Sequence, residues 1–201
     1  LFVQNAEKLG LDLTAVDAAV LSHAHYDHAN GMEAFFRCNS RAKFYVGHTC
    51  GADCYYKKLF LRRYIGVPKT VLQDFQDRVV YAGKEPMEIL PGVYLAPHKT
   101  VGLARVGRRE NMYRRTNGRW VPDDFSHEQS LVLDTEKGLV IFNSCSHGGA
   151  ADIIREVAGM FPGKTVYAII GGFHLYNKSK SEVLALAKEI QQTGIAYVCT
   201  G

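Results

Sequence analysis

Residues 22–28 read Ser22-His23-Ala24-His25-Tyr26-Asp27-His28 and follow the short apolar run 18–21, which we expect to form a buried strand. Three imidazoles and one carboxylate within six residues are nitrogen and oxygen donors suited to zinc, iron or manganese. His23 and His25 are two residues apart, so on extended backbone their side chains point the same way and can hold one ion. The carboxylate and the last histidine follow as the chain turns and can face a second ion. This stretch therefore predicts a metal site at the end of a strand.

Two later histidines occupy comparable positions. His147 lies in Asn143-Ser144-Cys145-Ser146-His147-Gly148-Gly149, after the expected strand 139–143. His174 lies in Ile170-Gly171-Gly172-Phe173-His174-Leu175, after the expected strand 166–170. Both stand where a strand meets a loop, beside paired glycines that let backbone approach a ligand closely. The sequence therefore predicts both histidines as completing ligands.

These three motifs resemble the metallo-β-lactamase superfamily: H-x-H-x-D-H after a strand, then a strand-end CSHGG and a strand-end GGFHL. More narrowly, they are similar to the branch named for dihydropterin–ribofuranosylaminobenzene phosphate synthase. The resemblance covers essentially the whole chain. It implies an α/β (α+β) fold, the αββα sandwich, with the metal site at one edge of its two sheets. It also implies that the first N-terminal strands are missing, so that residues 1–201 are a single domain truncated at both ends.

By position, the resemblance implies six metal ligands and one or two Zn²⁺ ions, with iron or manganese as alternatives. The ligands of one ion would be His23, His25 and His147, and those of the other Asp27, His28 and His174. Many members of the superfamily place a bridging aspartate after the strand that here ends at Phe142. This chain has Asn143-Ser144-Cys145 there instead, which weakens the second metal position.

Several other residues are candidates for supporting roles. Cys145 is nearest the position of the missing carboxylate, and we expect a small buried thiol there rather than a ligand. His127 is a candidate ligand, a support for a ligand or a substrate contact, and the neighbouring Glu128 could orient a ligating imidazole. His48 and His98 stand alone beside strand ends and are expected to have core or surface roles.

Two metal ions close together lower the pKa of a bound water toward ~7 and polarise the group under attack. Asp27 is then the expected catalytic residue, because it would ligate and orient the hydroxide. The leading hypothesis is a metal-dependent hydrolase of an ester, amide, thioester or phosphoester. The resemblance adds a second hypothesis, a transferase-like synthase acting on a pterin or ribofuranosyl-phosphate substrate. A non-hydrolytic metal protein with a redox or regulatory role is the third.

Residues 104–125 carry six arginines and three acids and follow neither a strand nor a helix period, so we expect a long loop. Long loops are often lids or binding loops. The planar fork of arginine suits phosphate and carboxylate. Arg114 and Arg115 are therefore candidates for holding an anionic small-molecule substrate, which we expect to be phosphorylated. A solvated surface loop without such a role is the alternative.

The composition of the 201 residues is that of a globular protein, with 47% hydrophobic residues, 22% charged residues and a net charge of +4. The longest apolar runs have four or five residues, far short of the ~20 that span a bilayer, so we expect no membrane partner. The modest charge gives no indication of nucleic acid binding. An odd number of cysteines, five, favours a reducing compartment and hence a cytoplasmic location.

The periodicity of the sequence predicts short strands that alternate with helices. The expected helices are 1–9, 31–36, 50–64, 150–160 and 179–192. The expected strands are 18–21, 43–46, 88–96 (broken, or two strands, at Pro91-Gly92), 130–134, 139–143, 166–170 and 195–198.

Overall fold

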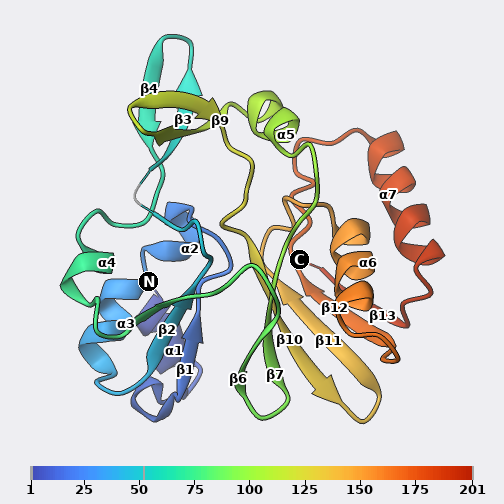
Figure 1. The fold of residues 1–201 in the computed structure, drawn as a ribbon, viewed down its shortest axis with the longest axis horizontal. Helices are drawn as coiled ribbons and strands as arrows, with labels where there is room; N and C mark the ends of the chain where they lie inside the picture. Colours follow the sequence, from blue (N-terminus) through green and yellow to red (C-terminus); the bar gives the residue numbers. More distant parts are fainter. Residues whose placement is uncertain (1, 52, 201) are drawn as a thin grey trace. The chain divides into compact units, whose positions relative to one another are not determined.

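The computed structural model describes residues 2–51 and 53–200. They form two compact units. The first unit comprises the residues up to Ala82 together with Ala104–His127, and the second comprises Gly83–Leu103 together with the residues from Glu128 on. Each unit has its own sheet and helices (Figure 1). The mixed α/β class expected from the sequence is confirmed, whereas a single domain over 1–201 stays a prediction.

The first unit contains a parallel three-stranded sheet of order β1-β2-β5. Its strands are β1 (Ala18–Val20), β2 (Lys43–Val46) and β5 (Val79–Tyr81), and its helical segments are α1 (Phe2–Lys8), the 3₁₀ turn Leu13–Ala15, α2 (Tyr26–Ala29), α3 (Met32–Cys38) and α4 (Val71–Asp74). Phe35 and Phe36 of α3 pack on Phe44 of β2, with ring centroids 5.5 and 5.3 Å apart. Burial of these rings fixes the helix on the sheet.

A second sheet of the first unit has the order β4-β3-β8-β9. It consists of β3 (Cys54–Lys58), β4 (Leu61–Tyr64), β8 (Met112–Thr116) and β9 (Arg119–Pro122), with α5 (Ala104–Arg109) before β8. The expected helix over 50–64 and the expected loop over 104–125 are therefore wrong. Tyr55 and Tyr56 favour a strand. The pair Asn117-Gly118, with φ of 50° and 76°, is a hairpin turn inside the arginine-rich segment.

The second unit contains a six-stranded sheet of order β13-β12-β11-β10-β7-β6. Its strands are β6 (Met87–Leu90), β7 (Val93–Pro97), β10 (Gln129–Thr135), β11 (Gly138–Asn143), β12 (Val166–Gly171) and β13 (Tyr197–Cys199), and its helices are α6 (Ala150–Met160) and α7 (Lys180–Gln192). These elements confirm the expected ones. Ile153, Ile154 and Val157 of α6 are buried in the core of this unit.

The histidine motifs lie at the ends of strands. β1 runs directly into residues 22–28 of the first unit. In the second unit β11 and β12 are parallel neighbours, so the loops that follow them, with His147 and His174, begin at the same edge of the sheet. None of the helices in the described part of the chain combines the length and apolarity needed to cross a bilayer.

Candidate metal centre

The histidines of the first motif lie together in the first unit. His25 keeps extended backbone (φ −84°, ψ 147°) and is the N-cap residue of α2, so the chain turns just after the second histidine. The rings of His23 and His25 are 4.8 Å apart, and those of His23 and His28 are 4.2 Å apart, measured between centroids. His23 and His25 are buried, and His28 is partly exposed. The hydroxyl of Ser22 is 3.0 Å from Nδ1 of His23. A metal ion would therefore bind this ring through Nε2.

Asp27 is the most accessible of these groups, with 59% of its side chain exposed. Its Oδ2 lies 3.4 Å from Nε2 of His28. The hydrogen bond to His28 lowers the pKa of Asp27 below its ordinary value, against a smaller opposing effect of burial. The carboxylate is therefore ionised at neutral pH, as a metal ligand must be.

Asp123 contacts the ring of His25 and can fix its orientation. The sequence analysis did not identify this residue. It is fully buried, and its Oδ2 lies 3.3 Å from Nε2 of His25 and 3.2 Å from Nε2 of His127. Its Oδ1 accepts the backbone N–H of Phe125 at 2.8 Å. Burial by itself raises the pKa of Asp123, but the two histidines outweigh it and hold the pKa well below the ordinary value. Because Asp123 occupies Nε2, Nδ1 is the ring nitrogen of His25 that could bind a metal ion. A carboxylate on the second ring nitrogen orients ligating histidines in many metal sites.

His127 is hydrogen-bonded to Asp123 in this structure, and a direct bond to a metal stays a prediction. Together with His25, Cys54 and Asp123 it forms a buried group whose donor atoms lie within 4.8 Å of one another, close enough for one ion. However, the backbone N–H of Ala24 donates to Nδ1 of His127 at 3.1 Å, so the neutral ring carries its proton on Nε2 and donates it to Asp123. Burial raises the pKa of Cys54 well above its ordinary value. Asp123 is thus the centre of a buried hydrogen-bonded group that includes both His25 and His127.

In the second unit, Cys145, His147 and His174 form another cluster, with one donor atom of each within 4.8 Å of the others. The rings of His147 and His174 are 4.6 Å apart between centroids. Buried Glu128 holds this loop through its backbone, because its carboxylate accepts the N–H groups of His147 at 2.9 Å and Gly148 at 2.8 Å. The sequence predicts that Glu128 orients an imidazole, whereas in the structure it orients the loop through backbone N–H groups.

The paired glycines bring the two loops of the second unit together. A Cβ on Gly171 would lie 1.6 Å from the carbonyl oxygen of Asn143, and one on Gly172 would lie 2.3 Å from that of Ser144. The N–H of Gly172 donates to the oxygen of Ser144 at 2.9 Å. The close approach that these glycines allow is between the backbones of the two loops. Approach of a ligand to this backbone stays a prediction.

Asn143, the last residue of β11, points into a buried hydrogen-bond network. Its Nδ2 donates to Oγ of Ser130 at 2.9 Å and to Nε2 of His98 at 3.2 Å. Its Oδ1 accepts the N–H of Ser146 at 2.7 Å. Nδ1 of His98 in turn lies 3.2 Å from Oε2 of Glu156. His98 therefore has a core role, one of the two expected for it, and Asn143 shapes the loop that carries His147.

The two candidate arginines differ in their surroundings. Arg114 is 12% exposed and is paired with Asp53 at 2.8 Å, and it also donates to the carbonyl oxygen of Thr49 at 2.6 Å. Burial lowers its pKa, but Asp53 outweighs that effect and raises it. Arg115 is exposed and lies 5.7 Å from the Trp120 ring. Arg114 is thus held in a structural pairing, and substrate binding by either residue stays a prediction.

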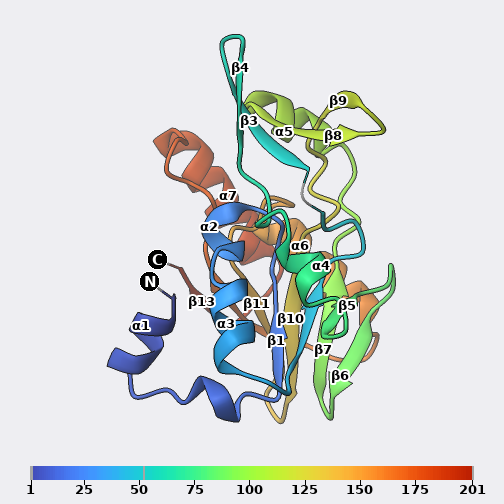
Figure 2. The ribbon, with the colours of Figure 1, turned by 90° about the vertical axis from the view of Figure 1, so that its left-hand side faces the viewer.

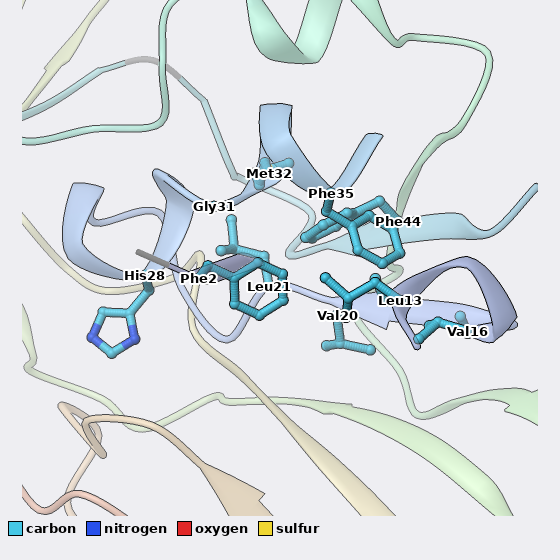
Figure 3. A pocket seen from close by; sticks show the side chains of 12 residues that line it. Phe2, Leu13, Val16, Val20, Leu21, His28, Gly31, Met32, Phe35 and Phe44 are labelled. Atoms are coloured by element: carbon cyan, nitrogen blue, oxygen red, sulfur yellow. The ribbon is translucent and has the colours of Figure 1, made fainter. Parts of the chain in front are cut away.

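An apolar cavity of about 290 Å³ lies in the first unit. His28 is the one polar side chain among its lining residues, and the others include Phe2, Leu21, Met32 and Phe35 (Figure 3). The cavity thus borders the first motif on its apolar side, and its lining offers few groups for polar recognition.

Known proteins resemble this chain along most of its length. It is 26% identical over 209 residues to 7,8-dihydropterin-6-methyl-4-(β-D-ribofuranosyl)-aminobenzene-5′-phosphate synthase of Methanocaldococcus jannaschii, covering 98% of this chain and 69% of the relative. The crystal structure of Tm1679, described as a metal-dependent hydrolase of the β-lactamase superfamily, aligns with a TM-score of 0.76 at 27% identity and covers 100% of this chain and 74% of that one. The chain thus resembles the metallo-β-lactamase superfamily in both sequence and fold.

The chain also matches an uncharacterized protein of Methanocaldococcus jannaschii, with 25% identity over 168 residues, 81% of this chain and 59% of the relative. No protein-family profile matches the chain. The resemblance to the superfamily and to its synthase-named branch, inferred from three short motifs, is confirmed. The imidazole and carboxylate donors of the first unit, and the imidazole and thiol donors of the second, fit a transition metal chemically.

Proposed function

We propose that the protein is a metal-dependent hydrolase that acts on an anionic small molecule. The observation that carries this proposal is the buried His23 and His25 pair, with Asp123 hydrogen-bonded to the second ring. A fully buried carboxylate that orients an imidazole is costly to maintain unless that imidazole has a defined task. The similarity to Tm1679, described as a metal-dependent hydrolase, supports the same conclusion.

The proposed ligand set is the one that the resemblance to the superfamily implies. In this proposal His23, His25 and His147 bind one Zn²⁺ ion, and Asp27, His28 and His174 bind a second. Bound ions of this kind supply Lewis acidity and lower the pKa of a water toward ~7. Within the protein, Asp27 is ionised and accessible, so it is the group that can orient a water beside the imidazoles.

The anionic class of substrate is proposed from the arginine-rich residues 104–125 and from the metal ions of this proposal, whose positive charge would attract an anion. Exposed Arg115 is the better candidate for an additional contact, because the guanidinium of Arg114 is already paired with Asp53. We therefore propose a phosphorylated or carboxylated substrate.

A synthase is the second candidate function. The relative at 26% identity, which this chain matches over 98% of its length, is named as the synthase of a dihydropterin joined to a ribofuranosylaminobenzene 5′-phosphate. Such a substrate is also phosphorylated, so both candidates share the same anion. They differ in outcome, since a hydrolase releases two fragments and a synthase joins two.

The test is metal analysis followed by a substrate screen on the intact chain. We expect one or two equivalents of a transition metal, and cleavage of a chromogenic phosphodiester, phosphomonoester, thioester or lactam that stops when a chelator is added. His25→Ala should lose metal and activity together, whereas His48→Ala, a histidine outside the cluster, should keep both. Full metal occupancy in His25→Ala would refute the ligand assignment. Joined products from a dihydropterin and a ribofuranosylaminobenzene phosphate, without hydrolysis, would favour the synthase.

A further inference from the structure

The sheet formed by β3, β4, β8 and β9, here called the basic sheet, is strongly cationic. Residues 54–64 and 112–122 contain seven lysines and arginines and no aspartate or glutamate. The seven are Lys57, Lys58, Arg62, Arg63, Arg114, Arg115 and Arg119. The whole chain carries a net charge of only +4, so this surface is a local concentration of positive charge.

The tip of the β3–β4 hairpin is apolar and exposed. Lys58 pairs with Leu61, which leaves Leu59 and Phe60 as the two turn residues. Leu59, Phe60 and Leu61 are 80%, 82% and 66% exposed. Leu59 also has a φ of 54°, a left-handed backbone that glycine or asparagine ordinarily supplies in such a turn. An apolar, strained residue that buries almost nothing in its own chain indicates a contact beyond the chain.

Aromatic side chains and cations alternate behind this tip. Trp120 lies under the guanidinium of Arg62 at 4.4 Å and near that of Arg115 at 5.7 Å. The rings of Tyr55 and Trp120 meet edge to face at 4.8 Å. Within the first unit the hairpin extends away from α2 and α3 in both views (Figures 1 and 2). Along the hairpin the order is therefore an apolar tip, then basic side chains interleaved with amphipathic aromatic rings.

We propose that the basic sheet docks on an anionic lipid surface, with Leu59, Phe60 and Leu61 entering the apolar layer. This order matches the layers of a membrane, since lysine and arginine bind lipid phosphates and tyrosine and tryptophan favour the interface. The sequence predicted no membrane partner because it lacks a spanning segment. Peripheral docking through a hairpin tip requires no such segment.

Other occupants explain less of this surface. A second copy of the chain on this surface would bring two sets of positive side chains together, and these repel one another even without Arg114, which is paired with Asp53. A nucleic acid would satisfy the charge, but it would leave the tip of Leu59 and Phe60 in water. The ring of Tyr55 is also engaged within the sheet, because it packs edge to face on Tyr64 as well as on Trp120.

The intact chain carries its own probe, because Trp120 is its one tryptophan. The experiment mixes the protein with phosphatidylcholine vesicles prepared with or without phosphatidylglycerol. We expect co-sedimentation and a blue shift of Trp120 emission with the phosphatidylglycerol vesicles alone. The binding should weaken as salt is added, because exposed charges are screened over about 8 Å at physiological ionic strength.

Two sets of variants separate the apolar contribution from the charge. Leu59→Asn with Phe60→Ser should weaken vesicle binding about tenfold or more, since binding strength scales with buried apolar area. Asparagine tolerates the left-handed turn, so this variant should fold. Lys58→Glu with Arg63→Glu should remove the preference for phosphatidylglycerol. Tyr176→Ser, 81% exposed outside the basic sheet, is the matched control and should bind like the parent protein.

Several results would overturn the proposal. One is the absence of binding to phosphatidylglycerol vesicles, and another is equal vesicle binding by the tip variant and its parent. Binding of a single-stranded oligonucleotide by a protein that ignores vesicles would assign the surface to nucleic acid. Self-association that Phe60→Ser abolishes, without vesicle binding, would assign it to a second copy.

Discussion

Replacing Asp123 with asparagine keeps the shape of the side chain and removes its negative charge. In the parent protein one oxygen accepts the N–H of Phe125 and the other faces Nε2 of both His25 and His127. An asparagine must present its NH₂ group to one of these two sides, so at least one buried donor loses its acceptor. Such a loss costs about 1–3 kcal/mol in the free energy of unfolding. Loss of the group that orients a ligating histidine typically lowers metal affinity about 10–100-fold.

Both quantities are measured on the same preparations, by urea unfolding and by competition for Zn²⁺ with a chelating dye. Asp124→Asn is the matched control, because this neighbouring carboxylate is 57% exposed and contacts Ser126 and Arg114 instead. We expect it to leave metal affinity unchanged. If folded Asp123→Asn bound Zn²⁺ as tightly as the parent, Asp123 would have no orienting role. A visible spectrum of the Co²⁺ form that differs from the parent would show directly that the ligand geometry has changed.

Further predictions concern the supporting residues. Cys145→Ser should keep the metal stoichiometry and most activity, and loss of one equivalent in elemental analysis would identify the thiolate as a ligand. Glu156 has a pKa below its ordinary value of 4.5, because hydrogen bonds from His98 and Thr100 outweigh the raising effect of burial. It therefore stabilises the fold above about pH 4.5, and that contribution is lost as pH falls through its lower folded pKa. Glu156→Gln should flatten this part of the stability profile measured by thermal unfolding. Arg114→Ala should cost about 2–3 kcal/mol in urea unfolding through its bonds to Asp53 and Thr49. Arg115→Ala should leave stability unchanged and raise KM if Arg115 contacts the substrate.

The elements with a strong local period could be predicted from the sequence. The hairpin of β10 and β11 was evident because two apolar runs flank the turn residues 135–138. The basic sheet was missed for a physical reason. Its strands are short and carry basic or aromatic residues on both faces, so no apolar alternation marks them. Cys50 and Cys54 are four residues apart and have aromatic neighbours, a pattern that is also typical of a helix.

The site could be predicted where its residues are neighbours in sequence. His23, His25 and His28 form one motif, and backbone geometry brings their rings together. Asp123 could not be found in this way, because it lies 98 residues after His25 in the chain. The adjacent Asp124 offers the same carboxylate, and only the fold decides which of the two is buried.

The close approach at Gly171 and Gly172 has a consequence for motion. The segment 143–149 and the segment 171–175 share backbone contacts too tight for any side chain, with a hydrogen bond between Gly172 and Ser144. Neither segment can open without breaking the contacts of the other. Their amide protons should therefore exchange with solvent as one cooperative group, at a common free energy of opening. A ligand that reaches only one of the two segments would slow exchange in both.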